Sequence, residues 1–417
     1  MSMAKTMRIL VVDEEIPYPL NSGKRIRTYC LLKQLASRHE IFFVCRQHED
    51  TAESFPASLE RIGIIPIIVP HLIQRKTGAK FFLALFANIF SRYPYSVTSH
   101  RSKILMGRIK QLLSEQHFDL VHCEWTPYAI NLAGVFGKIP TVVDAHNVEA
   151  MIWKRNFQVE TQPLKKAYFY LQWKKMEAFE RRYFTKFTRC IAVAENDARA
   201  ISQIVPGGFV DTVSNGVDMA YFTSQKPHRS ASGNNQTIVF TGSLDWRPNV
   251  DGVLYFLERI FPLVKMRYPA SKFVIVGRKP LQVLKDRVKG REDVILAGSV
   301  LDIRPYMDDA DVYVVPLRVG GGSRLKILEA FSMEIPVVST TIGAEGLDVS
   351  DGENILIADT PADFAAAIAS LIDDKSKAEK LGKRGRVIIE AQYQWKVLAK
   401  GLEQVWYKAI GEGPQCK

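Results

Sequence analysis

The stretch "PLRVGGGSRLKILEAFSMEIPVVST", residues 316–340, decides the fold of its part of the chain. It follows the apolar segment "DVYVVP" at 311–316, passes three glycines, continues as a helical segment and ends in a second apolar segment. A strand, a glycine turn, a helix and a further strand are the parts of a parallel β-α-β unit. The order of these parts therefore predicts a parallel sheet covered by helices.

The same alternation extends in both directions from this stretch. Earlier apolar segments are "TIVFTGS", "KFVIVG" and "DVILAG", and most of them lead into a helix. Before about residue 205, the apolar segments are "RILVV", "IFFV", "IIPIIV", "LVH", "TVVD" and "CIAV". Such alternation is typical of doubly wound α/β domains. We expect two Rossmann-like domains, 1–205 and 206–390, facing across a cleft, with a C-terminal helix at 391–417 that packs back on the first domain.

Length and composition are those of an ordinary globular protein. The chain has 417 residues, 47% of them hydrophobic, which fits two or three domains. Its most apolar run, "FFLALFANIF" at 81–90, is only about half of a membrane span and is followed by Arg92. The N-terminus moves directly into a strand without the apolar segment of a secretory signal. We therefore expect a cytoplasmic protein.

Cysteine usage and charge limit the function further. The five cysteines are scattered without a C-x-x-C pair, which argues against a disulfide framework and against a zinc site. The net charge of +12 admits an anionic partner: nucleic acid, an acidic membrane face or a phosphorylated small molecule.

Four loops that carry candidate binding residues begin where strands of the second domain end. They are "TGSLDWRPN", "VGRKP", "AGSV" and the stretch quoted first. Ligands of open α/β sheets bind at the carboxyl ends of the strands, so these loops are expected to face one pocket. Glycines before a helix let backbone amides approach an anion such as a phosphate. The plainer alternative is a glycine-rich turn with solvated basic residues.

The quoted stretch supplies specific candidates for that pocket. Arg324 and Lys326 oppose the helix dipole, a local cost that a bound anion would cancel. Glu329, one turn deeper, is placed to accept hydrogen bonds from two ribose hydroxyls.

These motifs resemble a known family. "FTGSLDWRPNVDGVLYF", "FVIVG", "SNGVDMAYF" and residues 316–347 are similar to the second domain of GT-B fold, family 4 type retaining glycosyltransferases. "PYPLNSGKRIRTYCLLKQLA" and "TVVDAHNVEA" resemble the acceptor side of the same family. The resemblance covers nearly the whole chain. It implies a nucleotide-sugar donor held mainly by the second domain and a glycan or lipid-linked acceptor held mainly by the first.

The chain departs from the family pattern at two places. The family has two glutamates eight positions apart; the second matches Glu329, whereas Gly321 stands at the first. Backbone amides at 321–323 are a candidate replacement. Many relatives carry arginine and lysine where this chain has Ser243 and Pro248. Three cations remain that could neutralise a diphosphate, and we expect them to be catalytic groups: Arg247, Arg324 and Lys326.

The resemblance also implies further site residues. His146 matches a histidine near the transferred sugar, although a histidine at a strand end is often a satisfied structural residue. Gly23 fits a glycine loop near the donor phosphates, although a glycine before a helix is often only a turn. The other expected donor contacts are Asn215, Gly242, Ser243, Gly277, Arg278, Val300, Gly320, Gly321, Gly322, Ser323 and Glu329.

No metal and no cofactor besides the nucleotide-sugar substrate is expected. Asp309 and Asp311 form a D-x-D pattern, but it lies between the end of a helix and the strand "VYVVP". Carboxylates in such a place cap backbone groups or face solvent. Arginine, lysine and helix amides can stabilise a departing diphosphate without a metal. Retention of the anomeric configuration would follow from the family.

The positive charge has one further interpretation. Residues 163–189 have the pattern of a basic amphipathic helix, and the plainer expectation is that its apolar side packs on its own domain. The functional alternative is that this helix and the region 75–92 contact an anionic membrane near a lipid-linked acceptor.

Two other functions stay open at this point: an epimerase or phosphorylase of the same fold, and a basic nucleic-acid-binding or regulatory protein. No nucleic-acid-binding motif supports the latter.

Overall fold

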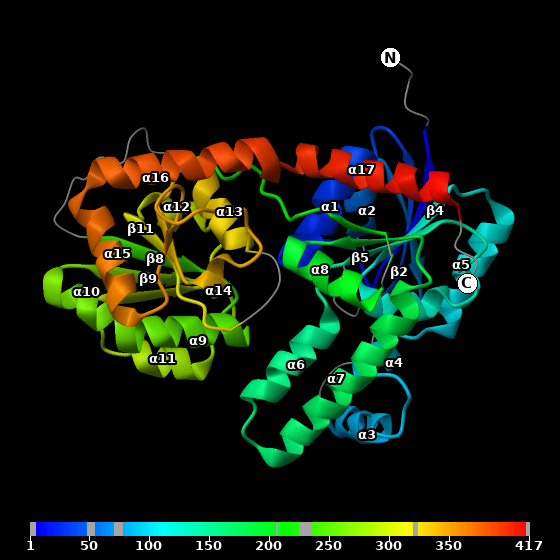
Figure 1. Cartoon of the computed structure of the whole chain (residues 1–417), viewed down its shortest axis with the longest axis horizontal. Coiled ribbons are helices and arrows are strands. Elements are labelled where there is room, and N and C mark those ends of the chain that lie inside the picture. Colours follow the sequence, from blue (N-terminus) through cyan, green and yellow to red (C-terminus); the bar gives the residue numbers. More distant parts are fainter. Residues whose placement is uncertain are drawn as a thin grey trace. The chain divides into compact units, whose positions relative to one another are not determined.

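The structure is a computed structural model that describes residues 6–47, 55–70, 78–205, 207, 209–224, 236–319 and 324–413. The chain divides into two compact units (Figure 1). Unit 1 comprises Met1–Ser214 with Leu398–Lys417, and unit 2 comprises Asn215–Val397. Residues 206–214, which the sequence analysis assigned to the second domain, thus belong to unit 1.

Unit 1 is built on a seven-stranded parallel sheet with the order β3-β2-β1-β4-β5-β6-β7. The central strands are almost wholly buried, as expected for a parallel sheet covered on both faces, and β4 and β5 carry buried polar residues near their carboxyl ends. The strands are β1 (Arg8–Val12), β2 (Glu40–Arg46), β3 (Ile64–Val69), β4 (Leu120–Glu124), β5 (Thr141–Ala145), β6 (Arg189–Ala192) and β7 (Val210–Thr212).

The helices of unit 1 follow these strands in alternation. They are α1 (Gly23–Leu35), α2 (Phe55–Glu60), α3 (Gly78–Asn88), α4 (Tyr95–Thr98), α5 (Lys103–Glu115), the 3-10 helix η1 (Thr126–Leu132), α6 (Glu149–Val159), α7 (Pro163–Phe184) and α8 (Glu195–Ile204). Helices α6 and α7 form a pair that extends away from the sheet (Figure 1). Aromatic contacts hold the pair together, with Trp153 against Phe169 and Phe157 against Trp173.

The last helix, α17 (Trp395–Glu412), starts in unit 2 and continues into unit 1. Trp406 is fully buried in unit 1, and its indole N–H donates to His122 Nδ1 at 3.1 Å. Glu403 lies 2.8 Å from His39 Nε2. These contacts make the end of the chain part of the core of unit 1.

Unit 2 contains a six-stranded parallel sheet with the order β10-β9-β8-β11-β12-β13. Its strands are β8 (Thr237–Thr241), β9 (Lys272–Val276), β10 (Val294–Gly298), β11 (Val312–Val315), β12 (Val337–Ser339) and β13 (Leu356–Ile357). Its helices are α9 (Arg247–Tyr255), α10 (Phe261–Arg267), α11 (Gln282–Val288), α12 (Arg304–Asp308), α13 (Leu325–Ser332), α14 (Thr341–Ala344), α15 (Pro361–Asp373) and α16 (Lys375–Ile388), with π-helical turns η2 (Phe256–Ile260) and η3 (Ile389–Tyr393).

Both sheets have the strand order of a doubly wound fold, which confirms the predicted fold class. The direction of winding reverses between β1 and β4 in unit 1 and between β8 and β11 in unit 2. Ligands of such folds bind beyond the carboxyl ends of the strands at these reversals. Within the described ranges, no helix is both long enough and apolar enough to span a membrane.

Candidate functional site

The loops after β8 and β9 pack backbone against backbone. A Cβ atom at Gly277 would lie 1.8 Å from the carbonyl oxygen of Gly242, a distance that no side chain tolerates. A Cβ atom at Gly242 would lie 2.8 Å from Lys326 Nζ. Close approach of backbone therefore requires glycine at 277, whereas a positive φ of 153° favours glycine at 242. The lysine of α13 lies beside Gly242, at the carboxyl end of β8.

Lys326 is the cation at the reversal point of unit 2. Its Nζ donates to Asn249 Oδ1 at 2.8 Å and lies 4.1 Å from the ring centre of Phe240. Burial lowers the pKa of Lys326 to about 7, although the nearby carboxylate of Glu329 acts in the opposite direction. A lysine of this kind gains its proton when an anion binds beside it.

Glu329 lies one helical turn after Lys326 on α13. Burial raises its pKa to about 7, and the charge of Lys326 only partly offsets that effect. Its side chain makes no hydrogen bond to any residue in the described part of the chain. The carboxyl group is thus a partly buried acceptor that a ligand hydroxyl can use.

The other predicted cations lie in different surroundings. The guanidinium of Arg324 is buried, donates to the carbonyl oxygen of Ile342 at 2.6 Å and lies 3.5 Å from Glu345. Arg247 is the exposed first residue of α9. Arg278, which follows β9, donates from Nε to Ser243 Oγ at 2.9 Å. The structure thus brings Arg278 to Ser243 and Lys326 to Gly242.

The remaining donor candidates lie in other loops of unit 2. Asn215 is buried at the start of unit 2, and Val300 is half-buried shortly after β10. The loop after β9 joins the end of β10 through a hydrogen bond in which Gly277 N donates to Gly298 O at 3.0 Å. The predicted contacts Gly320, Gly321, Gly322 and Ser323 lie outside the described residues.

The strand ends of unit 1 hold a second cluster around His146. Its Nε2 lies 2.8 Å from Glu124 Oε2, while Glu124 Oε1 lies 3.3 Å from His122 Nε2. His122 Nδ1 accepts from Trp406, so the proton of this imidazole is on Nε2 and faces Glu124. Burial favours a neutral Glu124, but hydrogen bonds from both histidines outweigh it and hold its pKa well below the usual range.

A second buried carboxylate faces the same region. Asp13, directly after β1, forms an ion pair with Lys24 of α1, and Lys24 lies 5.7 Å from the ring centre of Trp125. Burial raises the pKa of Asp13 to about 6; Lys24 lowers it and Glu124 raises it. Gly23, the first residue of α1, is thus directly next to a charged group at the reversal point.

A third carboxylate, Asp144, is neutralised inside the sheet. Arg27 Nη2 lies 2.8 Å from Asp144 Oδ2, and both side chains are almost completely buried. His122, Glu124 and Asp144 could in principle offer ligand atoms to one metal ion, because these atoms lie within 4.8 Å of one another. Each is already engaged, however, and the guanidinium of Arg27 supplies the positive charge that a metal would bring.

Sequence reasoning did not single out Glu124, Asp13 or Lys24. A pattern that could have identified them was present, because "VVDEE" and "LVHCE" are strands that end in carboxylates. Asn249 had no such pattern, since its role depends on Lys326 lying nearby in space.

With this geometry described, comparison with known proteins identifies the chain. Residues 22–221 match the family described as Glycosyltransferase Family 4, and residues 235–374 match the family described as Glycosyl transferases group 1. The chain is therefore a glycosyltransferase with the two domains of the GT-B fold.

Individual proteins show the same relationship. The chain is 22% identical to an uncharacterized 44.6 kDa protein in the cps region of Klebsiella pneumoniae, over 93% of this chain and 97% of that protein. It is 27% identical to a GDP-mannose-dependent alpha-(1-6)-phosphatidylinositol monomannoside mannosyltransferase of Mycobacterium tuberculosis, over 53% of this chain and 59% of that protein. The solved structure of Anabaena HepE in complex with UDP and glucose has a TM-score of 0.64 at 16% identity, covering 96% of this chain and 99% of that one.

Proposed function

We propose that this glycosyltransferase is a retaining enzyme of the family 4 type, which transfers a sugar from a nucleotide-sugar donor to a glycan or lipid-linked acceptor. The biological setting would be the biosynthesis of a cell-surface polysaccharide or glycoconjugate. The observation on which the proposal depends most is the pair of Lys326 and Glu329 at the reversal point of the unit 2 sheet, beside Gly242.

The chemistry of these groups fits a nucleoside diphosphate. A diphosphate needs a cation and close backbone, which Lys326 and Gly242 supply, and a ribose needs an acceptor for its hydroxyls, which Glu329 supplies. The solved HepE complex contains UDP and glucose, and the mycobacterial relative is GDP-mannose-dependent. These two proteins support a nucleotide-linked sugar as the donor class and leave the base open.

In the proposed reaction, the acceptor hydroxyl oxygen bonds to the anomeric carbon on the face from which the diphosphate departs. The bond between that carbon and the diphosphate breaks, and negative charge grows on the leaving oxygen. Lys326 becomes fully protonated as this charge develops, because an adjacent anion raises a pKa that burial had lowered to about 7. Arg247, exposed at the start of α9, is proposed to add a second cation when the donor is bound. The departing phosphate oxygen accepts the acceptor's proton, so a strong protein base is not required.

We propose that unit 1 contributes the acceptor side and His146. The hydrogen bond to Glu124 holds Nε2–H of His146 and leaves its Nδ1 available to a sugar hydroxyl. The acceptor is proposed to be a glycan or lipid-linked sugar; the mycobacterial relative acts on a phosphatidylinositol mannoside, as its name states. The proposed location of the enzyme is the cytoplasm, at the inner face of the membrane.

We propose that no metal ion takes part. The one group of clustered metal-type ligands in the described residues includes Asp144, whose carboxylate is bound by the buried guanidinium of Arg27. A divalent ion there would have to displace or repel that guanidinium. The test is full turnover in excess EDTA, and a loss of activity that Mg²⁺ or Mn²⁺ restores would contradict this part.

The first experiment on the donor is a thermal-shift panel of UDP, GDP, ADP and CMP, free and sugar-linked. We expect one nucleoside diphosphate to stabilise the parent, by about 2.7 kcal/mol at a hundredfold excess over Kd. Glu329→Ala should lose the shift, whereas Glu292→Ala, an exposed carboxylate of the same unit, should keep it. A shift that Glu329→Ala retains would contradict the proposed site.

The second experiment identifies the reaction. With the donor so found and an acceptor extract, NMR of the product should show the anomeric configuration of the donor. An inverted product would refute retention. Conversion of the nucleotide-sugar without transfer would indicate an epimerase, and release of a sugar phosphate that requires free phosphate would indicate a phosphorylase. Stabilisation by oligonucleotides alone would favour a nucleic-acid-binding protein.

A further inference from the structure

Helix α3 exposes a stripe of large apolar side chains. Phe82, Leu83, Phe86 and Phe90 are 66%, 67%, 63% and 80% exposed. Residues 82, 86 and 90 are four positions apart, so they lie along one side of the helix and of the turn that follows it. The rings of Phe86 and Phe90 contact each other, with centroids 5.9 Å apart. We call these four residues the α3 stripe; an exposed patch of this kind indicates an interaction site.

The opposite side of α3 is firmly attached to α7. Asn88 is buried and accepts a hydrogen bond from Gln172 Nε2 at 3.0 Å. Lys175 Nζ donates to the carbonyl oxygens of Asn88 and Ile89, at 2.7 and 2.9 Å, which caps the end of the helix. The α3 stripe therefore faces outward from a helix whose other side is fixed.

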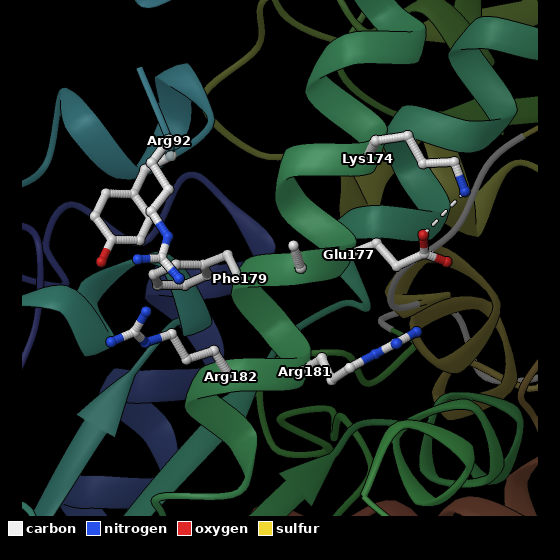
Figure 2. Close-up of a pocket in the computed structure, with 8 residues that line it drawn as sticks. Arg92, Lys174, Glu177, Phe179, Arg181 and Arg182 are labelled. Atoms are coloured by element: carbon white, nitrogen blue, oxygen red, sulfur yellow. Dashed lines mark hydrogen bonds and ion pairs between the residues drawn. The ribbon is translucent and has the colours of Figure 1, made fainter. Parts of the chain in front are cut away.

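A basic pocket is formed by Arg92 and Tyr93, which follow the α3 stripe in the sequence, together with residues of α7. It has a volume of about 480 Å³ and is lined by Arg92, Tyr93, Lys174, Glu177, Ala178, Phe179, Arg181 and Arg182. Figure 2 shows that Arg92 and Arg182 extend to the same side of α7, whereas Arg181 extends to the other side.

The charges in the basic pocket are only partly neutralised. Lys174 pairs with Glu177 at 3.1 Å. Within the described residues, Arg92, Arg181 and Arg182 have no carboxylate partner. Two unpaired guanidinium groups on one side of a concave surface are suited to bind a phosphate, which guanidinium matches in geometry and charge.

We propose that this surface docks unit 1 on an anionic phospholipid bilayer, with the α3 stripe inserted at the interface and a headgroup phosphate bound by Arg92 and Arg182. Apolar side chains beside cations are the pattern of proteins that lie on acidic membranes. A second copy of the chain fits less well, because pairing two stripes would also bring two basic pockets together. The inference deepens the proposed function and rests on it for the choice of a membrane near a lipid-linked acceptor.

The test is sedimentation of the full chain with vesicles of phosphatidylcholine, with and without about one third phosphatidylglycerol. We expect binding to the anionic vesicles only, weakened by salt. Arg92→Gln with Arg182→Gln should weaken it about 30-fold, since each cation at an anionic surface contributes roughly fivefold. The matched control, Lys285→Gln with Lys289→Gln, removes two exposed charges from unit 2 and should change it far less.

The apolar half is tested in the same assay. Phe82→Ser with Phe86→Ser should weaken vesicle binding at least about tenfold, because two inserted rings are lost. Leu301→Ser with Met266→Ser, which replaces exposed apolar residues of unit 2, is the control and should leave binding unchanged.

Several outcomes would overturn the inference. The parent could fail to bind vesicles, or it could bind neutral and anionic vesicles equally. The variants and their controls could lose vesicle binding to the same extent. The variants of the α3 stripe could abolish a dimer while vesicle binding persists. The nucleotide shift of every variant is measured in parallel. Vesicle binding without any nucleotide shift would uphold this surface and refute the proposed function, whereas a nucleotide shift without vesicle binding would do the reverse.

Discussion

Lys326 and Glu329 are a cation and a carboxylate one helical turn apart, and both have a pKa of about 7 because partial burial disfavours the charged form of each. In water, each would have its ordinary charge at neutral pH. Inside unit 2, small changes in the surroundings decide whether either group is charged. This makes the pair sensitive to a bound anion.

This sensitivity leads to a prediction about proton uptake. At pH 8, above its lowered pKa, Lys326 is mostly neutral, and an adjacent diphosphate should raise that pKa and draw in close to one proton. At pH 6 the lysine is already charged, so uptake through it should be near zero. Titration calorimetry of the bound nucleoside diphosphate in buffers of different ionisation enthalpy measures this directly. Lys326→Met should abolish the uptake at pH 8; an unchanged uptake in that variant would contradict the assignment.

Arg27 shows the cost of a buried charge that loses its partner. Its guanidinium pairs with Asp144 inside the sheet and also donates to the carbonyl oxygen of Ser214 at 2.7 Å. Arg27→Ala should destabilise unit 1 by about 3 to 5 kcal/mol, because Asp144 would stay buried without a cation. Lys174→Ala, which removes an exposed ion pair of the same unit, should cost about 1 kcal/mol or less. Thermal unfolding compares the two, and equal costs would show that Asp144 finds another partner.

At the scale of elements, the attachment of α3 depends on a short network of amides. Asn88 is linked to Gln172 of α7 and also donates to the carbonyl oxygen of Tyr93 at 3.0 Å. Gln172 Oε1 accepts from the backbone amide of Tyr95 at 2.8 Å. Asn88 Oδ1 and the backbone amide of Tyr95 would both need other partners if Gln172 were replaced by an apolar side chain.

We therefore predict that Gln172→Leu loosens α3. Loss of these hydrogen bonds should cost about 1 to 3 kcal/mol locally, because buried amide groups are left without partners. Hydrogen exchange measured by mass spectrometry should show faster exchange in peptides that cover Gly78–Asn88, with the strands of unit 1 unchanged. Lys174→Gln, on the exposed side of α7, is the control. Exchange that is unchanged in α3 would mean that its apolar contacts alone hold it in place.

Much of this arrangement could be predicted from the sequence, and the remainder depends on contacts between distant segments. The glycine turns and strand ends predicted both doubly wound sheets, and they predicted Lys326 in the first turn of the helix that follows the glycines. The partnership of His146 with Glu124 could not be derived, because it requires β4 and β5 to be neighbours in register, with Glu124 opposite Asp144. Arg324 was expected at an anion site, but the position of Ile342 and Glu345 beside it depends on how α14 packs.

At the scale of the whole molecule, α17 is the part of the chain that completes unit 1. Trp406 is completely buried there, and His122 relies on its indole for a hydrogen bond. Leu402 and Ala409 are buried on the same helix. The stability of unit 1 should therefore depend on residues at the end of the sequence.

We predict that Trp406→Ala destabilises unit 1 by about 3 to 5 kcal/mol through the cavity and the unpaired His122. Hydrogen exchange should rise in β1, β4 and β5, while the strands of unit 2 keep their protection. Gln404→Ala, an exposed position on the same helix, is the matched control. An equal rise in both units would contradict the division described above.

The discontinuous composition of unit 1 has a consequence for how the protein is made. Between Ser214 and Leu398 lie 183 residues, all of unit 2. A ribosome that adds about 5 to 20 residues per second needs roughly 10 to 40 s to synthesise them. During that time the first 214 residues are present without the helix that buries Trp406 against His122. Unit 1 can thus reach its final state only after unit 2 has been synthesised, although its own residues begin the chain.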